Sequence, residues 1–135
     1  MLVAKWCILV SLGIIYITRI FVARAQARVA GGYDNRMPRD QQTRLDDAGK
    51  RAHAAHYNGF ESFAPFAAAV LLAAIQHQAG RPVDPSMIDG FALGHVGCRA
   101  VYTGLYIADK PTARSTVWTL GFICVVAIFF IALFA

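Results

Sequence analysis

Two segments of the sequence carry polar side chains at helical spacing. In the first segment, Arg51, Asn58 and Glu61 lie seven and three residues apart. A helix turns by about 100° per residue, so this spacing places the three side chains within one face. The second segment repeats the pattern at intervals of four, three and four residues, with His95, Arg99, Tyr102 and Tyr106. Each segment is therefore expected to be a helix that presents one polar stripe.

The chemistry available to these stripes is the binding of an anionic ligand. Arginine has no neutral form within reach and suits carboxylates, so Arg51 and Arg99 are candidate carboxylate donors. Glu61 can pair with an arginine or hold a ligand amine. Arg114 and Ser115 follow the break at Pro111, where the N-terminus of the next helix also favours an anion. The combined positive field would lower the pKa of a bound thiol, so a ligand with two carboxylates, an amine and a thiol fits the set.

Each of these residues also has a structural interpretation. Glu61 can form an interhelical ion pair with Arg51 or Arg99 and do nothing more. Tyr102 and Tyr106 can be packing aromatics. Arg114 can be a charge that only fixes membrane orientation. Asn58 and Glu61 are the hardest to explain in this way, because they lie one turn apart inside an apolar segment.

The elements that position these residues are expected to be four membrane-spanning helices. The chain has 135 residues, of which 57% are hydrophobic and only 16% charged, and the apolar residues lie in long blocks. A bilayer core of ~30 Å needs roughly 20 apolar residues in a helix. We predict a single all-α domain over residues 1–135, an integral membrane four-helix bundle. Its helices are expected at about 3–27, 47–78, 86–108 and 112–134.

Lysine and arginine positions predict the orientation of the bundle. One end carries nine basic residues in the stretches 24–51 and 109–114, whereas the other end carries only Lys5 and Arg81. Cytoplasmic loops are the basic ones, so both basic stretches are expected in the cytoplasm and both termini outside it. The net charge of +5 has the same origin, because the basic residues flank apolar blocks, and we expect no nucleic-acid partner.

Cysteine and histidine spacing gives no metal pattern, so no metal site is expected. Cys7, Cys98 and Cys124 all lie inside apolar segments without CxxC spacing. A small transporter or a haem-carrying bundle that uses His53, His56 or His95 is a further interpretation. It is weakened because no two histidines are expected mid-bundle at matching depth on two helices.

The run from Arg51 to Phe66, RAHAAHYNGFESFAPF, resembles the second-helix signature of the MAPEG family, the membrane-associated proteins of eicosanoid and glutathione metabolism. The shared core is Arg, then Ala-His-x-Asn-x-x-Glu, then Pro-Phe. Arg99-x-x-Tyr102-x-x-x-Tyr106, followed eight residues later by Arg114-Ser115, is similar to the family's pattern in the third and fourth helices. The loop GGYDNRMPR is similar to that of bacterial members, so the resemblance extends over nearly the whole chain.

The resemblance implies a homotrimer in the bacterial inner membrane, with glutathione as co-substrate bound between neighbouring subunits near the cytoplasm. It also implies lipophilic small molecules from the bilayer as second substrates, and membrane lipids as surroundings. Arg114 would hold the thiolate, with Ser115 beside it, and Arg24 or Arg28 of the first helix would assist. The residues that the resemblance implies as glutathione contacts are Arg51, Asn58, Glu61, Arg99, Tyr102 and Tyr106.

The sequence also departs from the family's pattern. Eukaryotic enzymes of the family often carry an arginine where this chain has Ala54. Tyr57 stands where they have an arginine or a leucine, and Tyr102 stands where the prostaglandin synthase has a histidine. The leading interpretation is a glutathione-dependent membrane enzyme that conjugates glutathione to lipophilic electrophiles or reduces hydroperoxides. Transferase, peroxidase and isomerase chemistry all stay open. The alternative, motivated by Ala54, is a non-catalytic membrane scaffold of the same fold, or a binder of another anionic ligand.

Overall fold

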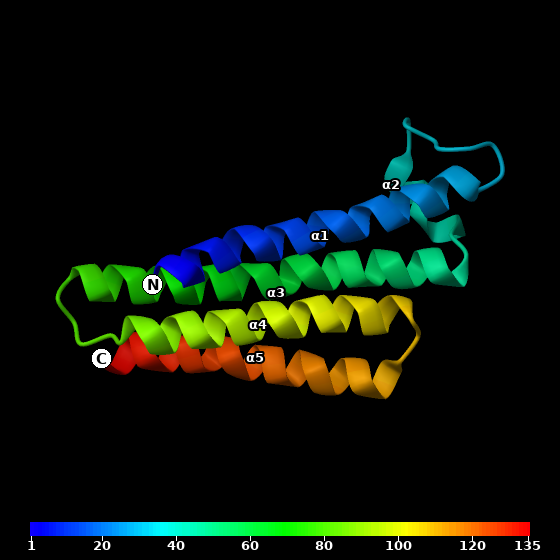
Figure 1. Cartoon of the computed structure of the whole chain (residues 1–135). Coiled ribbons are helices and arrows are strands. Elements are labelled where there is room, and N and C mark those ends of the chain that lie inside the picture. Colours follow the sequence, from blue (N-terminus) through cyan, green and yellow to red (C-terminus); the bar gives the residue numbers. More distant parts are fainter.

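Four long helices account for most of the chain in the computed structural model, which describes residues 1–135 and contains no strands. They are α1 (Leu2–Arg28), α3 (Asp47–Gln78), α4 (Pro85–Ile107) and α5 (Pro111–Phe134). Their ends lie within one residue of the ranges expected from the sequence. Figure 1 shows them side by side, with each helix antiparallel to the next along the chain. The expectation of an all-α protein is confirmed.

Short-range sequence signals account for the ends of these helices. The Asp46 carboxylate accepts a hydrogen bond from the backbone N–H of Gly49 at 2.7 Å and so caps α3. Asp84 caps α4 in the same way, through the N–H of Ser86 at 2.8 Å. Gly80 has a φ of +78° directly after α3, a conformation that glycine adopts readily. Proline opens α5 at a position where its missing N–H removes nothing from the helix.

The prediction of four helices is too low by one. A fifth, α2 (Pro38–Gln41), and a 3₁₀ turn (Gln42–Arg44) lie in the connection that the sequence marks as a turn-rich loop. Pro38 fixes φ for the first turn of α2. The Gln41 side chain is buried and donates to the Gly32 carbonyl at 2.6 Å. This contact holds the short helix against the loop, and loop composition alone does not reveal it.

Three of the helices, α1, α3 and α5, are long and apolar enough to cross a membrane. The outer surface agrees with this, because large apolar side chains such as Leu9, Ile17 and Phe130 are more than half exposed. In water such a surface would be unfavourable, whereas lipid chains or a neighbouring protein would cover it. Helix α4 is less apolar than these three helices, because it contains Asp89, Arg99 and several glycines.

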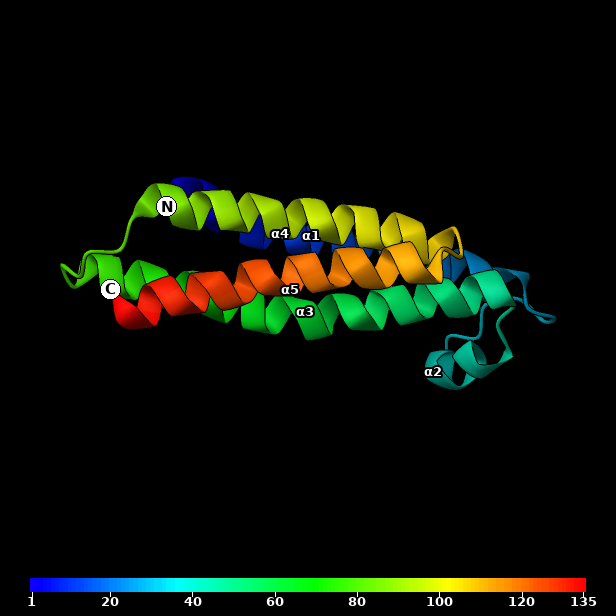
Figure 2. The same ribbon diagram turned by 90° about the horizontal axis from the view of Figure 1, so that it is seen from below.

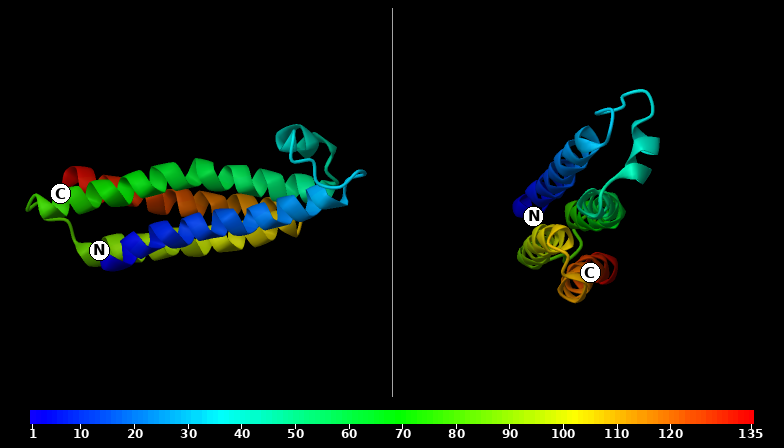
Figure 3. Two further views of the ribbon diagram at one scale, coloured as in Figure 1. Left: turned by 90° about the horizontal axis from the view of Figure 1, so that it is seen from above. Right: turned by 90° about the vertical axis from the view of Figure 1, so that its right-hand side faces the viewer.

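The bundle is arranged so that α3 and α4 both contact α1 on one side and α5 on the other. Both termini and the α3–α4 turn lie at one end, and the α1–α3 connection and the α4–α5 turn lie at the other (Figures 1 and 3). Small residues bring the helices close together. A Cβ on Gly59 of α3 would lie 2.8 Å from Cγ1 of Ile15 on α1, so only glycine allows this approach.

Candidate functional site

Helix α3 supplies the amide and the carboxylate of the candidate site. Asn58 Nδ2 donates a hydrogen bond to Glu61 Oε2 at 3.0 Å. The two residues are one turn apart, so their side chains meet on one face. Asn58 is half-buried, whereas Glu61 is exposed on the outside of the bundle. Pro65 has no N–H, so the carbonyl of Glu61, four residues earlier, lacks its usual helical donor as well.

Helix α4 joins this pair through a buried arginine. Arg99 Nη1 donates to Asn58 Oδ1 at 3.1 Å, and only 6% of Arg99 is exposed. Its guanidinium lies over the Tyr102 ring, 4.1 Å from the centroid. Such a stack is favourable because the ring face is negative. The rings of Tyr102 and Tyr106 then meet edge to face, with centroids 5.6 Å apart.

Helix α5 completes the series with Arg114 in its first turns. The Arg114 guanidinium lies over the Tyr106 ring at 4.1 Å from the centroid. A continuous series of contacts therefore crosses three helices, and we call it the polar chain. Its members in order of contact are Glu61, Asn58, Arg99, Tyr102, Tyr106 and Arg114.

The polar chain carries charges that the protein itself does not neutralise. No carboxylate lies within 4 Å of the guanidinium nitrogens of Arg99 or Arg114. Glu61 likewise forms no ion pair, so the proposed pairs with Arg51 and Arg99 are absent. One end of the polar chain therefore offers the carboxylate of Glu61, and the other end offers the guanidinium of Arg114. Together they could hold a ligand that carries both an ammonium group and an anionic group.

A groove adjoins the carboxylate end of the polar chain. It has a volume of about 120 Å³ and lies between α3 and α5. Its walls are polar near Asn58 and Glu61 and apolar beyond them. The lining residues are Asn58, Glu61, Ser62, Pro65, Trp118, Phe122 and Val125. The site therefore combines a polar subsite with an apolar one that opens on the outer face of the bundle.

Comparison with known protein families identifies one match for this sequence. The profile of the MAPEG family matches residues 3–134, which is nearly the full length. The chain belongs to the MAPEG family. No curated protein and no solved structure matches it significantly. The MAPEG family includes glutathione transferases and peroxidases as well as non-catalytic members, and its members typically use glutathione. As a MAPEG protein with three membrane-capable helices, the chain is an integral membrane protein.

Two of the residues expected at a MAPEG glutathione site lie outside the polar chain. Arg51 Nη1 is 3.6 Å from Asp109 Oδ2, so this arginine links α3 to the α4–α5 turn. Its Nε is buried and has no partner. The Ser115 hydroxyl is exposed and donates to the Pro111 carbonyl at 3.0 Å, so its proton is already engaged. The structure thus brings together six of the eight expected site residues.

Trp118 is the groove residue that the sequence analysis missed. It lies four residues after Arg114, and this spacing on α5 places both side chains on one face. Trp118 stacks on Phe122 with ring centroids 5.4 Å apart, which fixes the apolar wall of the groove. The sequence signal that could have identified Trp118 is its position four residues after Arg114.

His95, one of the histidines considered as a cofactor ligand, packs inside the bundle. His95 is buried and stacks on Phe66 with ring centroids 4.1 Å apart. Its Nδ1 lies 3.1 Å from the Gly121 carbonyl oxygen, which can only accept, so Nδ1 is the donor. No group of three His, Cys, Asp or Glu side chains is close enough to hold a metal ion. His95 is thus a packing residue that ties α4 to α5.

Proposed function

We propose that this MAPEG protein is a glutathione-dependent membrane enzyme. It would conjugate glutathione to lipophilic electrophiles or reduce lipophilic hydroperoxides through an arginine-stabilised thiolate. The observation that carries the proposal is the polar chain, which starts at the unpaired carboxylate of Glu61 and ends at the unpaired guanidinium of Arg114. A chain built only for stability would pair these charges with each other or with neighbours.

The charges of glutathione match those of the site. Glutathione carries one ammonium, two carboxylates and one thiol. Glu61 would accept from the ammonium, and Arg99 and Arg51 would donate to carboxylates. Asn58, Tyr102 and Tyr106 would provide further hydrogen bonds along the chain. Arg114 would face the sulfur, where its fixed charge and the α5 N-terminus both favour thiolate over thiol.

The reaction would then follow from thiolate formation and positioning. In conjugation, the sulfur lone pair forms the new S–C bond while the leaving group departs with its electron pair. In peroxide reduction, the thiolate sulfur would attack one peroxide oxygen, the O–O bond would break, and the alcohol would leave after taking up a proton. A second glutathione would then attack the resulting sulfenic acid sulfur, which gives the disulfide and releases water. The protein's residues would orient the two reactants and would place the cation of Arg114 beside the thiolate. Orientation of this kind raises the effective concentration of one reactant at the other, and so raises the rate. The apolar groove beside Trp118 would admit the second substrate from the bilayer.

We infer that the protein is an oligomer, because the site faces outward, and the family resemblance implies a homotrimer. Glu61 is exposed on the surface of a bundle whose outside is apolar. A carboxylate that faces lipid is costly, so such residues normally face protein or a wet cavity. A neighbouring subunit over the groove would cover Glu61 and enclose the ligand. The basic-residue asymmetry supports a site at the cytoplasmic side, with both termini outside the cytoplasm. The resemblance of the GGYDNRMPR loop to that of bacterial members supports a bacterial inner membrane.

Glutathione binding to the detergent-purified protein, measured by calorimetry, tests the proposal. Arg114→Ala and Glu61→Gln should each abolish saturable binding, because each removes one unpaired charge. Lys110→Gln is the matched control, since it removes an exposed positive charge four residues before Arg114. Binding that survives both site variants would refute the proposal, as would no binding by the wild type at millimolar glutathione.

The second candidate function is a non-catalytic membrane scaffold, or the binding of another anionic ligand. Two observations favour it. Ala54 replaces a family arginine, and the Ser115 proton is engaged by the Pro111 carbonyl. In that case Glu61→Gln would weaken subunit assembly, and no thiol-dependent activity would exist to be lost.

A further inference from the structure

A small internal cavity lies where α1, α3 and α4 meet. Its volume is about 10 Å³, which is just enough for one water molecule. Figures 2 and 3 show α1 running along α4, and α3 packs against both of these helices. The cavity therefore lies among three helices rather than on one surface. The polar part of its lining comes from all three, namely Ser11, Thr18, Ser62, His95, Arg99 and Thr103.

Two of the side chains in this lining carry a polar atom without a partner in the protein. Ser11 Oγ and His95 Nε2 are both buried, and neither forms a hydrogen bond. Ser11 is 4% exposed and His95 is 1% exposed, so neither faces bulk solvent. A buried polar atom that lacks a partner costs free energy, and such atoms are rare in folded proteins. Here two of them, from different helices, line the same cavity.

The Ser11 hydroxyl differs from other hydroxyls on the long helices. The hydroxyls of Thr103, Thr116 and Thr119 each donate to the carbonyl four residues earlier, at 2.9, 3.2 and 3.0 Å. This bond within one helix is a common way for a serine or threonine to satisfy its own hydroxyl. Ser11 does not form it, so its hydroxyl is available to a group inside the cavity.

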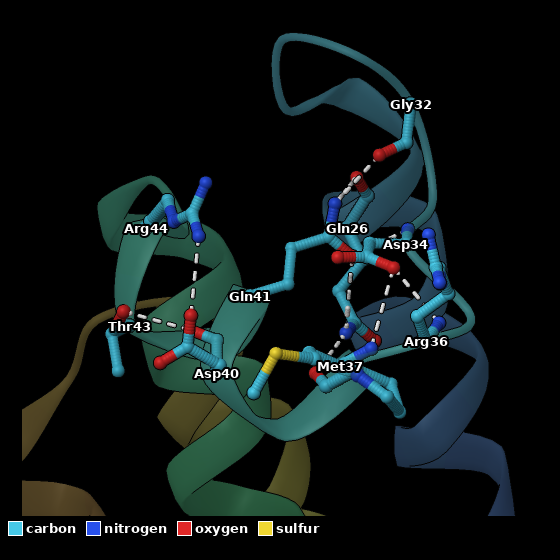
Figure 4. A network of polar contacts seen from close by, with 10 residues as sticks. Gln26, Gly32, Asp34, Arg36, Met37, Asp40, Gln41, Thr43 and Arg44 are labelled. Atoms are coloured by element: carbon cyan, nitrogen blue, oxygen red, sulfur yellow. Dashed lines mark hydrogen bonds and ion pairs between the residues drawn. The ribbon is translucent and has the colours of Figure 1, made fainter.

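Buried polar side chains elsewhere in the chain find partners within the protein. The buried Gln41 donates to the Gly32 carbonyl at 2.6 Å and accepts from the Asp34 N–H at 3.1 Å, as Figure 4 shows. In the cavity no hydrogen bond joins Ser11 to His95 directly. A small group between them would satisfy both.

The chemistry of the lining selects a ligand that can both donate and accept. His95 Nδ1 donates to the Gly121 carbonyl at 3.1 Å, so Nε2 of the neutral ring carries a lone pair and can only accept. The Ser11 hydroxyl can donate or accept. The proton of the Thr103 hydroxyl is engaged by the Arg99 carbonyl, which leaves its oxygen as a further acceptor. Water meets these requirements and also fits the volume.

We propose that this cavity is a binding site for one structural water molecule, which donates to His95 Nε2 and pairs with the Ser11 hydroxyl. The water joins the middle of α1 to α4. A direct hydrogen bond between these two helices lies near their termini, where Asp89 accepts from the Ala4 N–H at 2.8 Å. Buried waters with such partners are part of the structure and costly to remove. The proposal does not rest on glutathione, because its test does not use that ligand.

The first test detects the water directly, by solid-state NMR of the whole protein in phosphatidylcholine bilayers with ¹⁵N-labelled histidine. Nε2 of His95 has no proton of its own in the neutral ring, so magnetisation that passes from water to this nitrogen reports a water molecule in contact with it. We expect a water cross peak at His95 Nε2, assigned by its loss in His95→Phe. The exposed His77 is the positive control.

The second test asks whether the same water joins the two helices, through a double-mutant cycle of unfolding in mixed micelles. Ser11→Ala and His95→Phe each remove one end of the bridge. A bridging water is nearly as favourable as a direct hydrogen bond, so the double variant should raise the unfolding constant about 5-fold less than the product of the single effects. Loss of the Gly121 hydrogen bond occurs on both sides of the cycle and cancels.

The matched control pairs His95→Phe with Thr116→Val, which removes an exposed hydroxyl that already donates to the Thr112 carbonyl. These two changes should add within about 2-fold, as changes at distant sites usually do. A Ser11–His95 cycle that is equally additive would overturn the proposed bridge. The absence of a water cross peak at His95 Nε2, with one present at His77, would show a dry cavity and overturn the site itself. The wild-type spectrum decides this second point even if the His95 variant does not fold.

Discussion

Asn58 connects Glu61 to Arg99 through hydrogen bonds, so its replacement is the most informative perturbation of the polar chain. Its amide donates to Glu61 at 3.0 Å and accepts from Arg99 at 3.1 Å. Leucine has a similar size but can do neither. In Asn58→Leu the guanidinium of Arg99 would lose its only side-chain hydrogen bond to another helix while staying almost fully buried.

The magnitude follows from these two contacts. A hydrogen bond to a charged group contributes about 1.5–3 kcal/mol in general, but interhelical bonds in membrane proteins average only about 0.6 kcal/mol. The Glu61 contact is exposed and adds less than the Arg99 contact. We therefore expect Asn58→Leu to lower the free energy of unfolding by about 1–2 kcal/mol. Glutathione affinity should fall by at least about tenfold, which corresponds to 1.4 kcal/mol.

The assay is unfolding in mixed micelles, together with glutathione calorimetry, for Asn58→Leu and for the control Asn35→Leu. Asn35 is an exposed loop residue whose side chain forms no hydrogen bond within the protein, so its variant should match the wild type. Asn58→Asp separates the two contacts, because it keeps the acceptor for Arg99 but places a second carboxylate against Glu61. It should preserve α3–α4 packing and still weaken ligand binding. Unfolding energies of Asn58→Leu and Asn35→Leu that agree within about 0.3 kcal/mol, with equal glutathione affinities, would refute the reasoning.

Three further predictions concern the frame around the site. Gly59→Val should destabilise the bundle by about 1–3 kcal/mol in the same unfolding assay, because its side chain would collide with Ile15, whereas Gly13→Val, in open space, should not. His95→Phe should keep the stack on Phe66 but lose the Gly121 hydrogen bond, at about 1 kcal/mol; an unchanged unfolding energy would contradict the assigned role. Hydrogen bonds from the Ser86 hydroxyl and N–H lower the pKa of Asp84, so its contribution is present above about pH 4 and lost as pH falls below that. Asp84→Asn should remove this part of the acid dependence of unfolding, and a persistent dependence would assign it to other carboxylates.

The sequence predicted the long helices well, because membrane spans impose length and apolarity directly on the residues. The faces were predictable too: the spacing of Asn58 and Glu61, and of Arg99 and Tyr102, follows from helical periodicity. The contacts between the polar faces of different helices were not predictable. Arg99 contacts Asn58 and leaves Glu61 unpaired, while Arg51 contacts Asp109 instead. These choices depend on the relative height and rotation of α3 and α4, which periodicity within one helix does not determine.

The connection between α1 and α3 was least predictable. Its glycines, Pro38 and alternating charges predict a turn-rich loop, and the sequence gives no reason to expect Gln26 and Gln41 to be buried. Glutamine is mostly a surface residue, so its burial is decided by the partners it finds. Here the partners are backbone carbonyls, at Pro38 and Gly32, which no side-chain pattern encodes.

Two of the arginines on the long helices, Arg99 and Arg19, share one kind of hydrogen-bond partner. Arg99 is bonded by an asparagine and Arg19 by a glutamine, and neither meets a carboxylate. A neutral amide satisfies part of the hydrogen-bonding capacity of a guanidinium and leaves its charge uncancelled. A carboxylate in the same place would give a tighter internal pair and remove the attraction for an anion. The use of amides at both positions therefore keeps two positive sites available at membrane depth, and it holds each guanidinium in a fixed direction.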